Sequence, residues 1–183
     1  MTSSTKNLKN QLSSAALAGA LALSALPNGA NAGGPYQVFT IDPCRALDTR
    51  SGGEGFGRMS PDTSMDILVA DTFNQQQGGL ETCGIPFPEA KGIYANVVAV
   101  GPSGSGANFL TLYPFDTMPP LVSSINYAPD TAALANGIFV PICDEPPAPG
   151  TECDFDLVIF NGPSASTDVI LDITGYVAEP PPI

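Results

Sequence analysis

The sequence contains no histidine and no tryptophan, and only six of its 183 residues are lysine or arginine. Without histidine the chain cannot build a Ser-His-Asp or Cys-His catalytic site, and it contains no Gly-x-Ser-x-Gly nucleophile motif. Carboxylate pairs of the kind used by glycosidases remain, and Asp168 with Asp172, and Asp154 with Asp156, each share one predicted strand face. Because 18 residues are acidic, such spacings are expected by chance. The composition therefore predicts a protein that is not an enzyme.

Positive charge is scarce, and part of it is confined to the first residues. Lys6 and Lys9 precede an apolar, Ala- and Leu-rich run at residues 12–26, and residues 30–32 (Ala-Asn-Ala) match the small-x-small pattern of a signal-peptide cleavage site. We therefore expect residues 1–32 to be a signal peptide, with an N-terminal membrane anchor as the alternative. No other apolar run approaches the ~20 residues of a transmembrane helix. An exported protein, secreted or periplasmic, with no membrane insertion is expected.

Cleavage after residue 32 would leave 151 residues, which we expect to form a single β-domain at 33–178 and an exposed, proline-rich tail at 179–183. The two lysines of the signal peptide would leave with it, so the net charge would change from −12 to −14. The remaining cations are Arg45, Arg50, Arg58 and Lys91. Such an acidic surface repels nucleic acids and anionic membranes, so neither is expected as a partner.

The four cysteines all follow the expected signal peptide: Cys44, Cys83, Cys143 and Cys153. An even number of cysteines in an exported chain indicates disulfide bonds. Of the three possible pairings, Cys44–Cys83 with Cys143–Cys153 is favoured, because the second pair brackets a turn-rich, proline-containing segment. A zinc site is the competing interpretation, and the lack of histidine and of any Cys-x-x-Cys spacing argues against it.

The longest alternating pattern lies at residues 167–177. Four of its apolar residues share one face at period two: Val169, Leu171, Ile173 and Val177. Such a face requires a second sheet to cover it, which predicts an all-β protein of two layers, a β-sandwich or a jelly roll. About nine short strands are expected, at residues 36–41, 44–50, 64–70, 93–100, 108–113, 121–126, 134–141, 155–160 and 167–177.

Some connections can be predicted as well. A turn at residues 42–43 would separate the first two strands, and residues 101–106 would turn the strand at 93–100 into a hairpin with the strand at 108–113. The strand at 93–100 is almost continuously apolar, which is typical of a strand covered on both faces. Residues 88–91 are expected to form a single helical turn.

Arg50 ends the motif Asp48-Thr49-Arg50, and with so few cations in the chain it is expected to form a bidentate structural ion pair with Asp172 or Asp48. An exposed Arg50 without a partner is the alternative. Five acidic residues offer oxygen ligands for calcium: Asp144, Glu145, Glu152, Asp154 and Asp156. No Asp-x-Asp-x-Asp-Gly loop accompanies them. We expect no cofactor, with calcium at these acids as the alternative.

A set of short segments occurs along the chain in a recognisable order: Pro43-Cys-Arg-Ala-Leu-Asp-Thr-Arg50, Cys83-Gly-Ile-Pro86, Ala95-Asn-Val-Val-Ala-Val100, Phe109-Leu-Thr-Leu-Tyr-Pro114, Ser123-Ser-Ile-Asn126, Ala135-Asn136 and Asp168-Val-Ile-Leu-Asp-Ile-Thr-Gly-Tyr176. The set resembles a β-rich domain common in secreted bacterial proteins, often appended to or repeated within larger extracellular chains. That family has no established activity, so the resemblance implies a β-rich fold class and an extracellular location rather than a function. The chain departs from it at residues 95–98, where relatives commonly read Leu-Asn-Val-Thr, and at 143–153, which resembles a local addition.

Two classes of function remain. The first is a non-enzymatic structural or self-associating component of the cell surface, such as a matrix or filament subunit, whose partner is itself or another extracellular component. The second is an extracellular binding module or adhesin that recognises a glycan or a protein through loops such as residues 51–62 or 71–87. Small size, disulfide bonds and the lack of catalytic groups favour the first.

Overall fold

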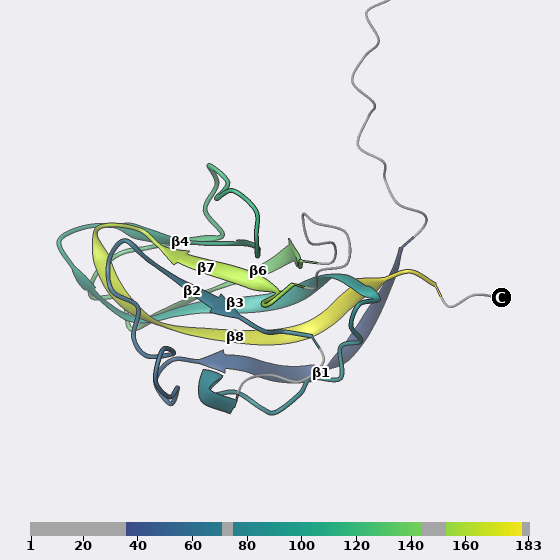
Figure 1. Cartoon of the computed structure of the whole chain (residues 1–183). Coiled ribbons are helices and arrows are strands. Elements are labelled where there is room, and N and C mark those ends of the chain that lie inside the picture. Colours follow the sequence, from purple (N-terminus) through teal and green to yellow (C-terminus); the bar gives the residue numbers. More distant parts are fainter. Residues whose placement is uncertain (1–35, 71–74, 144–152, 181–183) are drawn as a thin grey trace, which may run out of the picture. The chain divides into compact units, whose positions relative to one another are not determined.

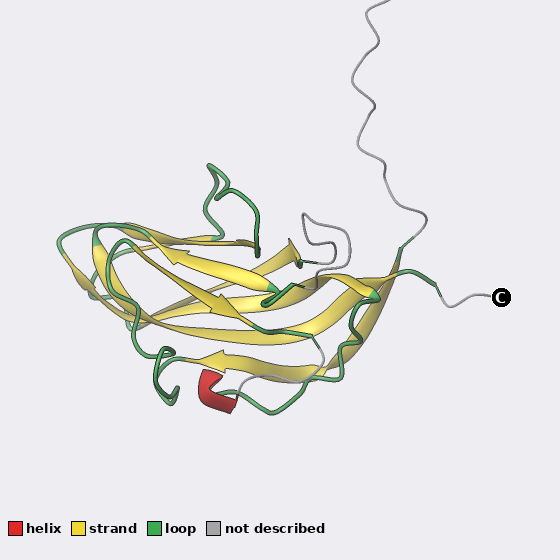
Figure 2. Ribbon diagram, viewed as in Figure 1, coloured by secondary structure: helices red, strands yellow, loops and turns green. Residues whose placement is uncertain are grey.

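The computed structural model describes residues 36–70, 75–143 and 153–180 (Figure 1). The signal peptide expected at residues 1–32 and the last three residues of the expected tail lie outside the described residues. Within these ranges the chain forms eight β-strands and one short 3-10 helix, η1 (Gln75–Gln77) (Figure 2). No helix in the described ranges is long and apolar enough to cross a membrane.

The strands form two four-stranded antiparallel sheets packed as a β-sandwich, the fold that the alternating patterns predict. The first sheet has the order β1-β8-β3-β6 and consists of β1 (Gln37–Asp48), β8 (Ala165–Ala178), β3 (Ala90–Gly104) and β6 (Ala133–Pro141). The second sheet has the order β2-β7-β4-β5 and consists of β2 (Thr63–Ile67), β7 (Leu157–Asn161), β4 (Asn108–Pro114) and β5 (Ile125–Tyr127). Consecutive strands lie in different sheets, except for β4 and β5. Most pairings therefore join distant parts of the chain.

β8 holds the centre of the first sheet, since it pairs with β1 on one side and with β3 on the other. Its alternation turns Val169, Leu171 and Ile173 into the core, where all three are fully buried. The second sheet contributes fully buried side chains to the same core: Ile67, Leu110, Leu157 and Ile159. Burying each Leu or Ile side chain stabilises the fold by about 1.5–3 kcal/mol. The apolar face of β8 is therefore covered as predicted.

β3 is covered on one face only. Ile93, Ala95 and Val97 face the core, whereas Tyr94 on the opposite face is 38% exposed. The prediction that this strand is covered on both faces is wrong. Its apolar character comes instead from small and β-branched residues, which remain half-buried on the outer face of the sheet.

β1 runs through Asp42 and Pro43 without the predicted turn. Its pairing with β8 shifts between Thr40 and Cys44, and again between Arg45 and Leu47. Irregularities of this kind place extra residues on one strand and can hold a proline, which has no N–H for the ladder. The two strands predicted here are therefore one bulged strand.

Other local predictions differ from the structure. β3 and β4 lie in different sheets and form no hairpin, because β3 continues to Gly104 in contact with β8. A single turn closed by a hydrogen bond from the N–H of Ala90 to the carbonyl oxygen of Pro86 (3.1 Å) lies at residues 86–90, slightly earlier than the turn expected at 88–91, and β3 begins at its end. The strand predicted at residues 121–126 is shorter and later, as β5, and the described strands number eight rather than nine.

The disulfide bonds are Cys44–Cys83 and Cys143–Cys153, the pairing favoured from the sequence. The paired Cα atoms are 5.6 and 6.2 Å apart, which is within the ordinary range for disulfides. The first bond joins β1 to the segment that follows η1. Two disulfide bonds indicate that the protein folds in an oxidising compartment.

Candidate functional site

A row of ion pairs lies on the outer face of the first sheet, where β1 and β8 run side by side. Arg45 lies opposite Asp172 in the strand register. Its Nε and Nη2 groups donate hydrogen bonds to the two carboxylate oxygens, at 2.8 and 3.1 Å. A bidentate, charge-assisted pair is stronger and more directional than a neutral hydrogen bond. The hydrogen bond to Asp172 raises the pKa of Arg45 above its ordinary value.

Asp48, at the end of β1, is shared between two arginines. Its carboxylate accepts a hydrogen bond from Arg45 (3.2 Å) and two from Arg50 (2.8 and 2.7 Å). Because Asp48 is only 5% exposed, its charge depends on these partners. The hydrogen bond from Arg50 is the main cause that lowers the pKa of Asp48 below its ordinary 3.8.

Thr49 and Arg58 complete the row at Asp168. The Thr49 hydroxyl donates to Asp168 (3.0 Å) and accepts a hydrogen bond from the N–H of Val169 (2.9 Å). Arg58 donates from Nη1 to Asp168 and from Nη2 to the carbonyl oxygen of Gly101, both at 2.6 Å. Three of the four cations beyond residue 32 thus bind carboxylates of β1 and β8. The three residues of the motif at 48–50 therefore all make hydrogen bonds that hold the end of β1 in place.

This arrangement settles the prediction for Arg50. Arg50 binds Asp48, but the other expected partner, Asp172, is bound by Arg45 instead. Asp172 lies farther along β8, and the cross-strand register places Arg45 opposite it. Asp168 and Asp172 share one face of β8 as expected, and each is bound to a guanidinium group. A hydrolase of the carboxylate-pair type needs two carboxyl groups that can reach a substrate.

The acidic residues considered as calcium ligands do not form a cluster in the described part of the chain. Three of them lie outside the described residues: Asp144, Glu145 and Glu152. Asp154 is exposed, whereas Asp156 is buried and accepts hydrogen bonds from the backbone N–H groups of Val69 and Ala70. Among the residues that the structure describes, no group of three or more His, Cys, Asp or Glu could hold a metal ion.

Charge is distributed very unevenly along the chain. Between Lys91 and Asp144 only Asp116 and Asp130 are charged, although the chain contains 18 acidic residues. This charge-poor segment, residues 92–143, includes most of β3 and all of β4, β5 and β6. Among the described residues it also holds six of the nine large apolar side chains that are exposed: Tyr94, Met118, Leu121, Val122, Leu134 and Phe139. The surface is therefore apolar where it lacks charge.

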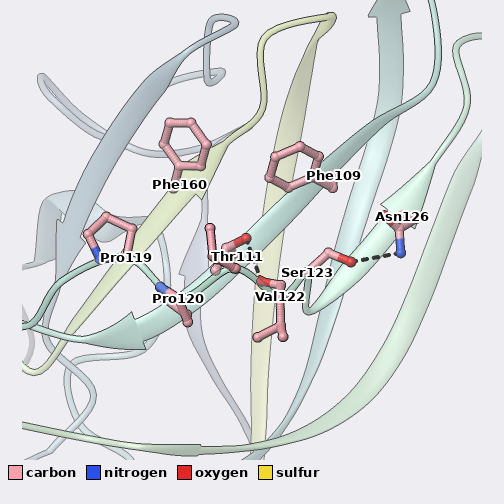
Figure 3. Close-up of a pocket in the computed structure, with 9 residues that line it drawn as sticks. Phe109, Thr111, Pro119, Pro120, Val122, Ser123, Asn126 and Phe160 are labelled. Carbon is pink, nitrogen blue, oxygen red and sulfur yellow. Dashed lines mark hydrogen bonds between the residues drawn. The ribbon is translucent and has the colours of Figure 1, made fainter. Parts of the chain in front are cut away.

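The β4–β5 loop, residues 115–124, borders a groove of about 440 Å³ on the outer face of the second sheet (Figure 3). Phe109 of β4 and Phe160 of β7 line one part of the groove, with ring centroids 6.0 Å apart. Pro119 and Pro120 of the loop line another part (Figure 3). The lining is mostly apolar, which is typical of a site for a ligand or for a partner side chain.

The returning limb of the β4–β5 loop is anchored to β4. The Thr111 hydroxyl donates to the carbonyl oxygen of Val122 (3.0 Å), and the N–H of Ser124 donates to the carbonyl oxygen of Leu110 (2.8 Å). The loop backbone is thus held in place while the side chain of Leu121 is fully exposed. Large apolar side chains that are held exposed in a group indicate an interaction surface.

A second hollow, of about 450 Å³, is lined by residues of the same loop together with residues of β4 and β6. Tyr113 of β4, Val122 of the loop and Ile138 of β6 belong to its lining. On the other face of β6, the ring of Phe139 contacts the ring of Tyr94 of β3, with centroids 5.1 Å apart. β6 therefore carries apolar side chains on both of its faces.

The sequence patterns do not predict this surface. They indicate a break between strands at residues 119–120 and candidate binding loops at residues 51–62 and 71–87. Two features of the sequence could have indicated this surface: the scarcity of charge between residues 92 and 143, and the two adjacent large apolar residues Leu121 and Val122 directly after the prolines.

No family model, curated protein or solved structure matches this chain. The resemblance to a β-rich domain of secreted bacterial proteins therefore stays a prediction.

Proposed function

We propose that the protein is a secreted, non-enzymatic component of the cell surface that associates with copies of itself through the charge-poor segment. The observation that carries this proposal is the separation of charge from exposed apolar surface. Two copies that each carry −14 after removal of the signal peptide repel one another through their acidic surfaces. The electrostatic cost of approach is lowest where charge is absent, and the exposed apolar side chains lie in that same segment.

Two further observations support the proposal. The acids on the outer face of β8, Asp168 and Asp172, are engaged by arginines, which supports a structural role for this face. The two disulfide bonds, together with the expected signal peptide, support an extracellular location, with the periplasm as the alternative compartment. The resemblance to domains of bacterial extracellular proteins points in the same direction.

The test is the oligomeric state of the exported protein as a function of ionic strength. The screening length falls from ~30 Å at 0.01 M salt to ~8 Å at physiological ionic strength. We expect monomers at 0.01 M sodium chloride and larger species at physiological salt, as measured by sedimentation velocity and light scattering. Millimolar calcium chloride should promote association more steeply if carboxylates of two copies share an ion. A profile that stays monomeric from low salt through millimolar calcium contradicts the proposal.

The groove beside the β4–β5 loop favours a second candidate, an extracellular binding module for a glycan or a protein. Phe109 and Phe160 offer aromatic rings against which a sugar or an apolar side chain could pack. Saturable binding by a monomeric protein on a glycan array, lost in Phe160→Ala, would support this candidate. The matched control is Phe39→Ala, which removes a ring of the first sheet that stacks on Tyr176.

A further inference from the structure

In the described residues the sandwich has four edge strands, and three of them carry some protection. The second half of β1 is covered by the segment after η1, where the N–H of Leu80 donates to the carbonyl oxygen of Arg45 (2.8 Å) and Leu47 forms a β-bridge with Gly78. Its first half carries a charge, a proline and a bulge at residues 42–43. β2 has five residues and carries Asp66, and β5 has only three residues. Cover, charge and short length are the usual means by which edge strands avoid pairing with other chains.

β6 has none of these protections in the described part of the chain. It is nine residues long and contains no charged residue, and seven of the nine residues are exposed. It lies at the end of the first sheet and pairs with β3 along one side only. A long, uncharged and apolar edge strand is the kind of strand that adds a further strand from another chain.

The hydrogen-bond pattern shows which residues of β6 face the open side. The N–H of Gly101 donates to the carbonyl oxygen of Ala132 (2.9 Å), and the N–H of Ile142 donates to the carbonyl oxygen of Lys91 (3.3 Å). The register between these two points is unbroken. In an antiparallel ladder the residues alternate between those that bond to the neighbouring strand and those that point away from it.

The even-numbered residues of β6 therefore direct their backbone groups to β3, and the odd-numbered residues direct theirs to the open edge: Ala133, Ala135, Gly137, Phe139 and Pro141. Pro141 fits this assignment, because its missing N–H would have pointed to the open edge and β3 loses no hydrogen bond. Four consecutive odd positions, from Ala133 to Phe139, thus present both an N–H and a carbonyl group to an incoming strand.

We infer that the partner for this edge is β6 of a second copy, paired antiparallel about a two-fold axis so that the two first sheets become one continuous sheet. This inference rests on the proposed function and specifies its first contact. A two-fold contact must be self-complementary, since the same surface serves both copies. Pairing Ala133 with Phe139, and Ala135 with Gly137, uses all four open positions and leaves Pro141 outside the ladder.

Side-chain size and charge agree with this register. Each Phe139 ring would lie opposite the small Ala133 of the other copy and diagonal to its Ala135, so the large side chain has room. Nothing lies within 4 Å of a Cβ built on Gly137, so this face of the strand is open. β6 contains no charged residue, so pairing two copies of it brings no like charges together. Contact through the acidic parts of the surface would instead be opposed by repulsion between carboxylates. Because the contact uses the β6 edge of both copies, it closes at a dimer.

The inference can be tested with a matched pair of substitutions at Gly137, in the exported protein at physiological salt. Gly137→Pro removes an N–H that points to the open edge and leaves the ladder with β3 intact, whereas Gly137→Ala keeps that N–H. We expect dimers of the parent and of Gly137→Ala in sedimentation velocity, and an association constant lower by on the order of tenfold or more for Gly137→Pro. Circular dichroism establishes that each variant is folded.

A second pair keeps the test decisive if Gly137→Pro fails to fold. Ala135→Glu places like charges on facing strands and should abolish the dimer, whereas Asn126→Glu adds the same charge on β5 and should leave it unchanged. A folded Gly137→Pro or Ala135→Glu that dimerises as well as the parent overturns the β6 contact while self-association stands. A parent that stays monomeric at every salt concentration overturns the proposed function and this contact together.

Discussion

Arg45 of β1 and Asp172 of β8 lie opposite each other across the strand pair and share two hydrogen bonds of 2.8 and 3.1 Å. The contact joins residues that are 127 positions apart in the sequence. β1 is the outermost strand of the first sheet, so this ion pair helps to hold the beginning of the domain against its last strand.

Arg45→Lys should lower the free energy of unfolding by about 1 kcal/mol, because an ammonium group cannot make the bidentate contact. The expected loss is modest because the Arg45 side chain is 40% exposed and water screens the pair. A double-mutant cycle with Asp172→Asn in urea isolates the contact from the effect of each substitution alone. A coupling energy near zero would show that the pair is a surface contact without energetic weight.

Asp48→Asn should cost more, about 2 kcal/mol at pH 7, because the buried carboxylate accepts hydrogen bonds from Arg45 and Arg50 together. The pKa of Asp48 is lowered in the folded protein. Its stabilisation is therefore fully present above the ordinary 3.8 and disappears as the pH falls through the lowered value. Urea melts at pH 7 and near pH 2 should show the difference between parent and variant shrinking in acid. An unchanged difference would contradict this assignment.

Asp66 should behave in the opposite way. Burial, and to a lesser extent the negative charge of Asp116, raise the pKa of Asp66. Its ionised form therefore destabilises the fold once the pH rises above the ordinary 3.8. Asp66→Asn should raise the urea midpoint at pH 7 and leave it unchanged near pH 3. The exposed Asp154→Asn is the control, and an equal gain from that substitution would point to a general effect of net charge.

The two-layer fold could be predicted because the buried residues of a β-strand recur at every second position of the sequence. Val169, Leu171 and Ile173 recur at every second position, opposite a face that carries Asp168 and Asp172, and a covered sheet face requires that pattern. The ends of strands were harder to place, since the neighbouring strand decides where pairing stops. β3 continues to Gly104 because β8 lies beside it that far, through residues with weak strand propensity.

The partners in the ion pairs could not be predicted from the sequence. The scarcity of cations predicts that arginines bind aspartates, but not which ones, because a bulge in β1 sets the facing residues. Arg45 and Arg50 reach the same Asp48 although alternation alone would place them on different faces. The groove was missed for a related reason, since Phe109 and Phe160 meet only after β4 and β7 have paired.

The two disulfide bonds should contribute unequally to stability. They close chain segments with sequence separations of 39 and 10, for Cys44–Cys83 and Cys143–Cys153 respectively. Loop-closure entropy predicts losses of about 3.9 and about 2.7 kcal/mol when each pair is replaced by serine. Urea denaturation of the two double variants measures both losses. A larger loss for Cys143–Cys153 would mean that its short loop stabilises the fold through contacts rather than through chain entropy.

Gln77 is a residue whose role only the structure reveals. It belongs to a run of three glutamines in a polar segment, yet its side chain is completely buried. Its Oε1 accepts a hydrogen bond from the N–H of Leu68 (2.9 Å), and its Nε2 lies within hydrogen-bonding distance of the carbonyl oxygens of Leu68 (2.9 Å) and Ala46 (3.1 Å). Ala46 is the residue at which the pairing of β1 with β8 shifts, so its backbone needs a partner outside the ladder. Gln77 supplies that partner and joins β1 to the chain that follows β2.

Gln77→Leu should therefore lower the free energy of unfolding by on the order of 3 kcal/mol, because it leaves buried backbone groups of Ala46 and Leu68 without partners. Gln77→Glu keeps the shape and the acceptor for Leu68 but loses the amide donor, and it buries a charge at neutral pH. Its stability should accordingly recover in part as the pH falls and the carboxyl group gains a proton that it can donate. Gln75→Leu, at an exposed position of the same short helix, is the control and should change stability by less than about 0.5 kcal/mol. Equal losses at the two positions in urea melts would contradict this assignment, because only Gln77 is buried.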